Sequence, residues 1–337
     1  MIHRRKLLIA LGAGSFADGL AGGLTGGFAA HAQQPPQRMR RIGYFTQGSI
    51  ESNAPFLAAF RAGMTALHWV EGRDYAIDAR YTDGNPQNSP RLSAELVAKQ
   101  PELLLTAGDE SLRALLEQTK TIPIVGAIMQ DPVGLGLVAS LRRPGGNATG
   151  LTSLASGLGP KRLQLLKEAL PRLTHVVVLF EAGNIGSVAA WKEIEAAARH
   201  LKLRATPIEI RQPADIEAAF ERGAALRAQA YLATQGGLLF IQRQALVGRT
   251  VALKVPLMST TAATTDAGGL MSYGASLPDN FRRAAGYVDK IFKGAKPGEL
   301  PMQQPVTFEF VVNLKTAKTI GITLPPVVLL QADRVIE

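Results

Sequence analysis

Two short polar segments in the first half of the chain follow apolar runs and lead into helical patterns. They hold the candidate ligand-binding residues Gln47, Ser49, Gly108, Asp109 and Ser111. Free N–H groups and the helix dipole at a helix start favour a carboxylate there, and serine hydroxyls add donors. Helix capping explains Ser49, Asp109 and Ser111 equally well, so both roles stay open.

Acidic residues in the same half indicate a different ligand charge. Asp109 and Glu110 would repel a carboxylate if they pointed inward, which favours a cationic or zwitterionic solute. Asp131 ends an apolar run before Pro132. It is suited to accept a hydrogen bond from a substrate ammonium group or to form an Asx turn.

Polar residues also follow apolar runs in the second half, where specificity groups of a binding site are expected. They are Glu181, Asn184, Thr234 and Gln235. Tyr273 ends a further apolar run just before Gly274. Its ring either stacks on a ligand or packs at the edge of the core.

Patterns for catalysis and metal binding are missing from the sequence. There is no cysteine, which excludes disulfides, thiolate metal sites and cysteine nucleophiles. His68, His175 and His200 are isolated, and there is no HExxH, GxSxG or P-loop pattern. We therefore expect no enzyme, no cofactor and no metal site.

The charge does not indicate a nucleic-acid partner. The formal net charge is +10, from 37 Lys and Arg against 27 Asp and Glu, but the basic residues are scattered without a stripe. Aromatic residues make up only 6% of the chain, which argues against a stacking platform for single strands.

Short apolar runs alternate with helical patterns along the chain, as in parallel sheets with crossover helices. The series that begins at Arg41 restarts at His175, element by element, at an offset of about 130 residues. We predict an α/β protein of two similar Rossmann-like lobes with parallel sheets. Ligands of open parallel sheets bind beyond the carboxyl ends of the strands, so the ligand cleft should lie between the lobes.

Residues 1–32 are typical of a cleaved secretion signal. A basic start is followed by an apolar stretch and by Ala30-His31-Ala32, a small-x-small cleavage site. Asp18 and the many glycines disfavour a membrane anchor. The pair Arg4-Arg5 also resembles a twin-arginine signal, so export by the Sec or the twin-arginine route stays open. We expect a periplasmic protein.

Several collinear segments between residues 40 and 337 resemble one family. They include IPIV at 122–125, DPVG at 131–134, LxxPGGNxTG at 141–150, KxxxLLKE at 161–168, GGLMSYG at 268–274 and FExVVNLKTAK at 308–318. Together they are similar to the ABC transporter substrate-binding proteins of the tryptophan-importer-like family.

The resemblance implies a type I periplasmic-binding-protein fold with three crossing segments. Residues 40–153 and about 268–300 would form lobe 1, and about 158–262 and 305–337 lobe 2. It also implies a monomer that captures a small solute, such as an amino acid or an aromatic or organic-acid-like compound. The partners would be an ABC permease and its ATPase in the inner membrane.

Two loops depart from the family pattern. Gly108 is followed by Asp109 and Glu110, where a small residue and proline are usual, and Glu181 to Asn184 replace a usual Asn-Pro. Both loops should face the cleft, so the solute of the family does not transfer. Two other classes stay open: an exported ligand-sensing module for a membrane regulator, and an enzyme that uses Asp131 and Glu181 as paired carboxylates.

Overall fold

The computed structural model describes residues 39–153 and 157–337. The predicted secretion signal of residues 1–32 lies outside the described residues. None of the described helices combines the length and apolar character that crossing a bilayer requires.

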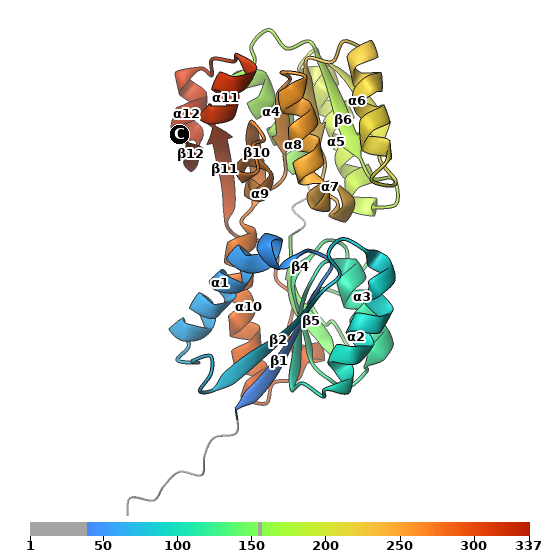
Figure 1. Cartoon of the computed structure of the whole chain (residues 1–337), viewed down its shortest axis with the longest axis vertical. Coiled ribbons are helices and arrows are strands. Elements are labelled where there is room, and N and C mark those ends of the chain that lie inside the picture. The colour runs from blue at the N-terminus through green and yellow to red at the C-terminus, as the bar shows by residue number, and fades with distance from the viewer. Residues whose placement is uncertain (1–38, 154–156) are drawn as a thin grey trace, which may run out of the picture. The chain divides into compact units, whose positions relative to one another are not determined.

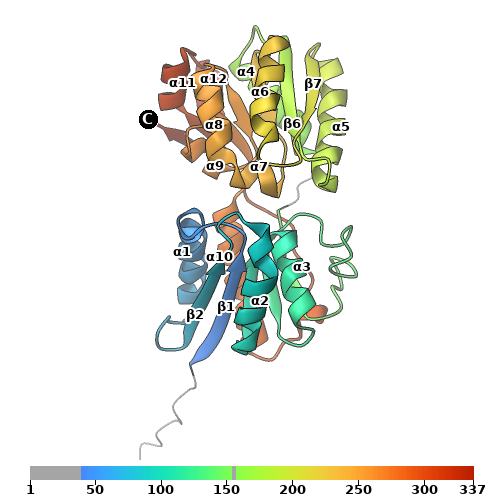
Figure 2. The ribbon, with the colours of Figure 1, turned by 45° about the vertical axis from the view of Figure 1, so that its right-hand side comes forward.

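The first sheet has five parallel strands in the order β2-β1-β3-β4-β5. The strands are β1 (Arg40–Thr46), β2 (Tyr75–Tyr81), β3 (Leu103–Ala107), β4 (Ile124–Met129) and β5 (Ala148–Thr152). The helices of this lobe are α1 (Ile50–Ala66), α2 (Ser89–Ala98), α3 (Asp109–Gln118) and α10 (Leu277–Phe292), with short 3-10 turns η1 (Pro86–Asn88) and η2 (Pro297–Glu299). Figures 1 and 2 show α1 and α10 on one face of the sheet and α2 and α3 on the other.

The second sheet has seven strands in the order β12-β11-β10-β9-β8-β6-β7. They are β6 (His175–Phe180), β7 (Arg204–Glu209), β8 (Ala230–Ala233), β9 (Leu257–Ser259), β10 (Met271–Ala275), β11 (Phe308–Asn313) and β12 (Arg334–Ile336). The helices are α4 (Leu158–Ala169), α5 (Ile185–His200), α6 (Asp215–Ala225), α7 (Gly237–Ile241), α8 (Arg243–Ala252), α9 (Ala262–Asp266), α11 (Leu314–Ile320) and α12 (Pro326–Gln331). Among the strands of the described residues, only β10 and β11 pair antiparallel.

The two sheets repeat one topology. Read from β7, the second sheet runs β7-β6-β8-β9-β10, which matches β2-β1-β3-β4-β5 of the first. The predicted α/β fold of two similar lobes with mostly parallel sheets is confirmed.

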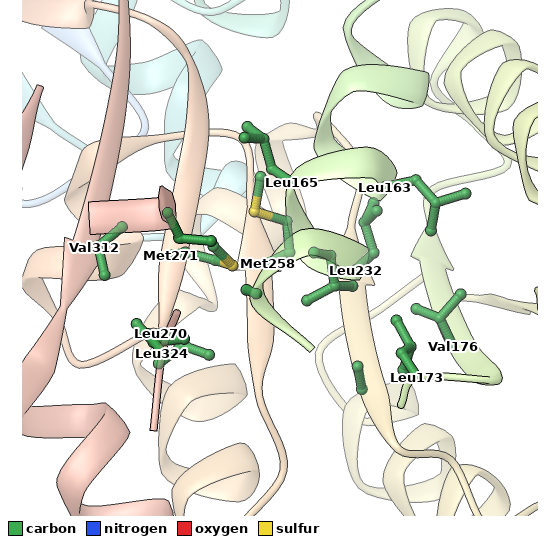
Figure 3. Packing of buried hydrophobic residues seen from close by; sticks show 14 of the residues in the cluster. Leu163, Leu165, Leu173, Val176, Leu232, Met258, Leu270, Met271, Val312 and Leu324 are labelled. Atoms are coloured by element: carbon green, nitrogen blue, oxygen red, sulfur yellow. The ribbon is translucent and has the colours of Figure 1, made fainter. Parts of the chain in front are cut away.

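Strand alternation fills a core on both faces of each sheet. In β6, Val176 and Val178 pack under α4 and α5, while Val177 and Leu179 pack under α6 and α8. Figure 3 shows the first of these cores, in which Leu163 and Leu165 of α4 pack with strand side chains such as Met258. Such two-sided burial accounts for the unbroken apolar runs of these strands.

The chain passes between the sheets three times: from β5 to α4, from β10 to α10 and from η2 to β11. Gln303, on the third passage, exchanges backbone hydrogen bonds with β5, because its N–H donates to Gly150 and its carbonyl accepts from Thr152. The third passage is therefore tied to the first.

One predicted boundary differs from the structure. We expected residues from about 268 to belong to the first lobe, but β10 pairs with β9 and β11 in the second sheet. The return to the first sheet begins with α10 at Leu277. The apolar segment 270–275 is a strand of the second sheet because it continues the parallel order after β9.

Candidate functional site

A cavity of about 130 Å³ lies where the carboxyl ends of the two sheets meet. Thr46, Ala107 and Ile128 line it from the ends of β1, β3 and β4. Gln235 and Thr260 line it from the residues that follow β8 and β9. In open parallel sheets this is the edge at which ligands bind.

The wall of the cavity is partly aromatic. Phe56 of α1 and Phe240 of α7 both line it, with ring centroids 6.4 Å apart and planes inclined by 33°. Ile241 and Leu277 extend this apolar wall. A ligand body that is apolar or aromatic would lose unfavourable contact with water against such a surface.

The start of α3 adds a polar group to the cavity. Gly108, with φ of 91°, is the N-cap residue, and no side chain caps this helix. Ser111, in the first turn, lines the cavity and is 1% exposed, yet its hydroxyl has no hydrogen-bond partner among the described residues. A buried hydroxyl without a partner costs free energy, which a ligand acceptor would relieve.

Arg162 brings a cation to the same cavity. Its Nε donates to the carbonyl of Tyr273 at 2.6 Å. Burial lowers the pKa of the guanidinium to about 10, because desolvation disfavours the charged form. The group nevertheless remains protonated at neutral pH.

Amide side chains connect the two lobes beside the cavity. Asn184 Nδ2 donates to Gln130 Oε1 at 2.7 Å, and Gln130 lines the cavity. Within the second lobe, Gln235 Nε2 donates to the carbonyl of Gly186 at 3.0 Å. Asn184 Oδ1 also accepts the N–H of Ser187, so these amide groups hold the second-lobe loops in place.

Four of the residues singled out in the sequence line this cavity: Gln47, Gly108, Ser111 and Gln235. They come from the carboxyl ends of both sheets, as the parallel-sheet rule predicts. The structure brings together one polar loop from each of three strands and the start of one helix.

Three first-lobe residues singled out in the sequence do not line it. Ser49 forms a capping box with Ser52 at the start of α1. Asp131 Oδ1 accepts the N–H of Gly134, three residues further along the chain, at 2.9 Å. Asp109 is buried and accepts the N–H groups of Gln130 and Asp131, so its carboxylate fixes the loop after β4. Burial raises the pKa of Asp109 to about 6.

The remaining second-lobe residues also serve the backbone. Glu181 Oε1 accepts the N–H of Leu239 in α7 at 2.7 Å, and Asn184 is the N-cap of α5. Thr234 is buried and bonds Ser187 and the carbonyl of Leu179. Burial raises the pKa of Glu181 to about 7, and the charge of Glu110 adds to the rise.

Tyr273 lies outside the cavity lining as well. Its ring packs against Phe308, with centroids 6.5 Å apart. Its backbone carbonyl is what reaches the site, because it accepts from Arg162. The predicted stacking of this ring on a ligand therefore finds no support in the geometry, and its packing at the core edge does.

Sequence reasoning missed Arg162, Phe56 and Phe240. All three lie on helices, at positions that fit the ordinary pattern of core and surface residues of an amphipathic helix. No local signal marks them, because only the meeting of two lobes turns these helix faces toward one space. Among the described residues, no group of three or more His, Asp or Glu side chains is placed to hold a metal ion.

Comparison with known proteins decides the family. A family model described as ABC transporter substrate binding protein matches residues 56–336. The chain belongs to this family. The family resemblance read from the sequence motifs is thereby confirmed, and the family is one of substrate-binding components of transporters.

Individual relatives are similar at low identity. A tyrosine-binding protein of Clostridioides difficile is 21% identical over 253 residues, which are 75% of this chain and 72% of that protein. Two solved structures each align with 88% of this chain and with all of their own chain, and each alignment has a TM-score of 0.79. One is a conserved domain protein from Vibrio cholerae at 24% identity, and the other is an ABC domain in complex with L-Trp from Streptococcus pneumoniae at 23% identity. These structures establish the two-lobed fold.

Proposed function

We propose that the protein captures an amino acid or an aromatic or organic-acid-like solute in the cavity between its two sheets. It then hands the solute to an ABC permease and its ATPase in the inner membrane. The observation that carries this proposal is the cavity itself, because both sheets line it at the edge where ligands of parallel sheets bind.

The lining supports an amphiphilic solute. Phe56, Phe240 and Ile241 offer an apolar surface, while Ser111 and Arg162 offer donors. Amino acids and aromatic acids combine such an apolar body with an acceptor group. Two relatives carry names or titles with tyrosine and L-Trp, which agree with this class.

Solute transport also needs a conformational change. A solute that touches both lobes stabilises the arrangement in which they meet, by its differential affinity for that state. The three passages between the sheets are the segments about which hinge closure would occur. We propose residues 40–153 with the piece that returns from about Leu277, and about 158–276 with 305–337, as the moving lobes.

The family and the sequence support a place of action outside the cytoplasm. We propose that residues 1–32 direct export and are removed, and that the mature protein acts as a periplasmic monomer. The carboxylates Asp131 and Glu181 lie outside the cavity lining and bond backbone N–H groups. The solute should therefore leave the protein chemically unchanged.

A matched pair of serine variants tests solute capture. Ser111→Ala removes the unpartnered hydroxyl in the cavity, and Ser89→Ala removes a buried, unpartnered hydroxyl on α2 outside it. We expect Ser111→Ala to weaken binding of the best solute about 5-fold, the effect of roughly 1 kcal/mol for one hydrogen bond. Ser89→Ala should leave the Kd unchanged.

The measurement is isothermal titration of the purified protein after a thermal-shift screen of amino acids and aromatic acids, in which a bound solute raises Tm by mass action. Mass spectrometry of the recovered solute shows whether it is altered. Equal weakening by both variants, or conversion of the solute to a product, would contradict the proposal.

A further inference from the structure

Arg162 is an unusually placed charge. It lies in the first half of α4, is 4% exposed and lines the cavity. Burying a guanidinium removes its hydration, and an unpaired buried charge is costly. Such a residue normally has a carboxylate partner.

The described part of the chain supplies no such partner. Nε bonds the carbonyl of Tyr273, and no described residue accepts a hydrogen bond from Nη1 or Nη2. Glu193 is close enough for its charge to raise the pKa of Arg162 slightly, yet its carboxylate oxygens accept the N–H of Gly157 and form no ion pair with Arg162. The two Nη groups therefore remain as a planar pair of donors.

Gly274 and Thr260 lie next to these donors. A Cβ on Gly274 would stand 3.5 Å from Arg162 Nη2 and would overlap the carbonyl of Thr260. Thr260, Thr261 and Ser153 line the cavity with polar side chains. This end of the cavity is thus polar, whereas Phe56 and Phe240 form the apolar wall.

No buried acid balances Arg162 within the cavity lining. Glu110 is the one carboxylate among the lining residues, and its side chain is exposed. Asp109 and Glu181 bond backbone N–H groups outside the lining. Among the lining residues, the carboxylate that an ammonium group on the solute would meet is that of Glu110, an exposed charge that water screens.

We infer that Arg162 recognises the solute by its carboxylate, and that the α-amino group of an amino-acid solute adds little to its binding. The two Nη groups match the two oxygens of a carboxylate, which is the geometry in which arginine binds such groups most strongly. This inference rests on the proposed function and specifies the ligand chemistry of the same site. It reverses the preference for a cationic or zwitterionic solute that Asp109 and Glu110 suggest in the sequence.

The first test uses the wild-type protein and matched probes. Each set contains an aromatic or aliphatic amino acid, its deaminated acid and its decarboxylated amine; for tyrosine these are L-tyrosine, 3-(4-hydroxyphenyl)propanoate and tyramine. Isothermal titration at pH 7 should give the deaminated acid a Kd within about 10-fold of the best amino acid. The amine should bind at least about 100-fold more weakly.

The second test uses variants. Arg162→Met should weaken binding of acid and amino acid by about 100-fold, and Arg162→Lys should restore part of it. Arg40→Met is the matched control, because Arg40 begins β1 at the end away from the cavity and pairs with Glu102. Glu110→Gln should change the Kd of the amino acid by less than about 3-fold.

The outcomes separate the two proposals. An amine that binds as tightly as its acid overturns the role of Arg162. A large loss of amino-acid affinity in Glu110→Gln overturns the small contribution of the amino group, and solute capture stands in both cases. If no probe of any set binds, the solute class of the proposed function falls as well. If Arg162→Met fails to fold, the ranking of acid against amine on the wild-type protein still decides.

Discussion

Two acids beside the cavity, buried Asp109 and half-buried Glu181, bond the protein's own backbone. Asp109 accepts from the loop after β4, and Glu181 accepts from the first turn of α7. Both carboxyl groups are largely desolvated, which raises their pKa values to about 6 and about 7. These two acids thus shape the loops that line the site, and their charge state should influence stability.

Replacing Glu181 by glutamine should flatten the dependence of stability on pH. The pKa of Glu181 is raised in the folded protein above its ordinary 4.5. Its favourable contribution is complete below pH 4.5 and is lost as the pH rises through about 7. Between about pH 5 and 8 the Tm of the wild type should fall further than that of Glu181→Gln, by about 2 °C.

Differential scanning calorimetry across this range makes the comparison. Glu299→Gln is the control, because the side chain of Glu299 is exposed and pairs only with Lys296. Parallel Tm curves for wild type and Glu181→Gln would contradict the burial of this carboxyl group.

Residue types alone could not decide which polar groups bind. Ser49 and Ser111 both stand in the first turn or cap of a helix after a strand, yet Ser49 is used in a capping box and Ser111 has no partner among the described residues. The difference depends on Ser52, three residues beyond Ser49, and on what lies across the cavity. The position of Ser52 could be read from the sequence, whereas the surroundings of Ser111 across the cavity need the tertiary structure.

At the scale of elements, glycines permit the close approach of strands. Gly150 in β5 has φ of 142°, and a Cβ there would overlap the backbone of Gly126 in β4. These two strands pair in parallel through that point, with a register shift between Gly126 and Met129. Because β5 leads to the first passage between the lobes, its pairing with β4 helps to fix where that passage begins.

Gly150→Ala should destabilise the protein by about 2–4 kcal/mol, because the added methyl strains the backbone and separates the strands. Gly286→Ala is the opposite case, since Gly286 lies inside α10 with no atom within 4 Å of a new Cβ. It should stabilise by about 0.5–1 kcal/mol. Urea denaturation measures both; a neutral Gly150→Ala would contradict the close approach of β5 to β4.

Element types were predictable where periodicity was strong. β6 begins at His175, where the sequence predicts the restart of the series. After β8 the chain forms two helices, α7 and α8, which meet at Gln242. The apolar segment that forms β10 carries no local sign of the sheet it joins, because membership depends on pairing with β9 and β11.

At the scale of the whole molecule, a repeated topology creates the site. Two sheets of matching strand order meet at their carboxyl ends, and the cavity takes lining residues from both. The repeat and the cleft follow from the offset of about 130 residues in the sequence. The sequence offset does not indicate that side chains on helices, such as Arg162 and Phe240, line the same cavity, because that depends on how the lobes face each other.

The most direct test of solute capture is a crystal structure of the protein with its tightest-binding solute from the screen. The account predicts density in the cavity between the lobes, in contact with Ser111 and with residues of both sheets. Density that touches one lobe only, or that lies outside this cavity, would contradict it.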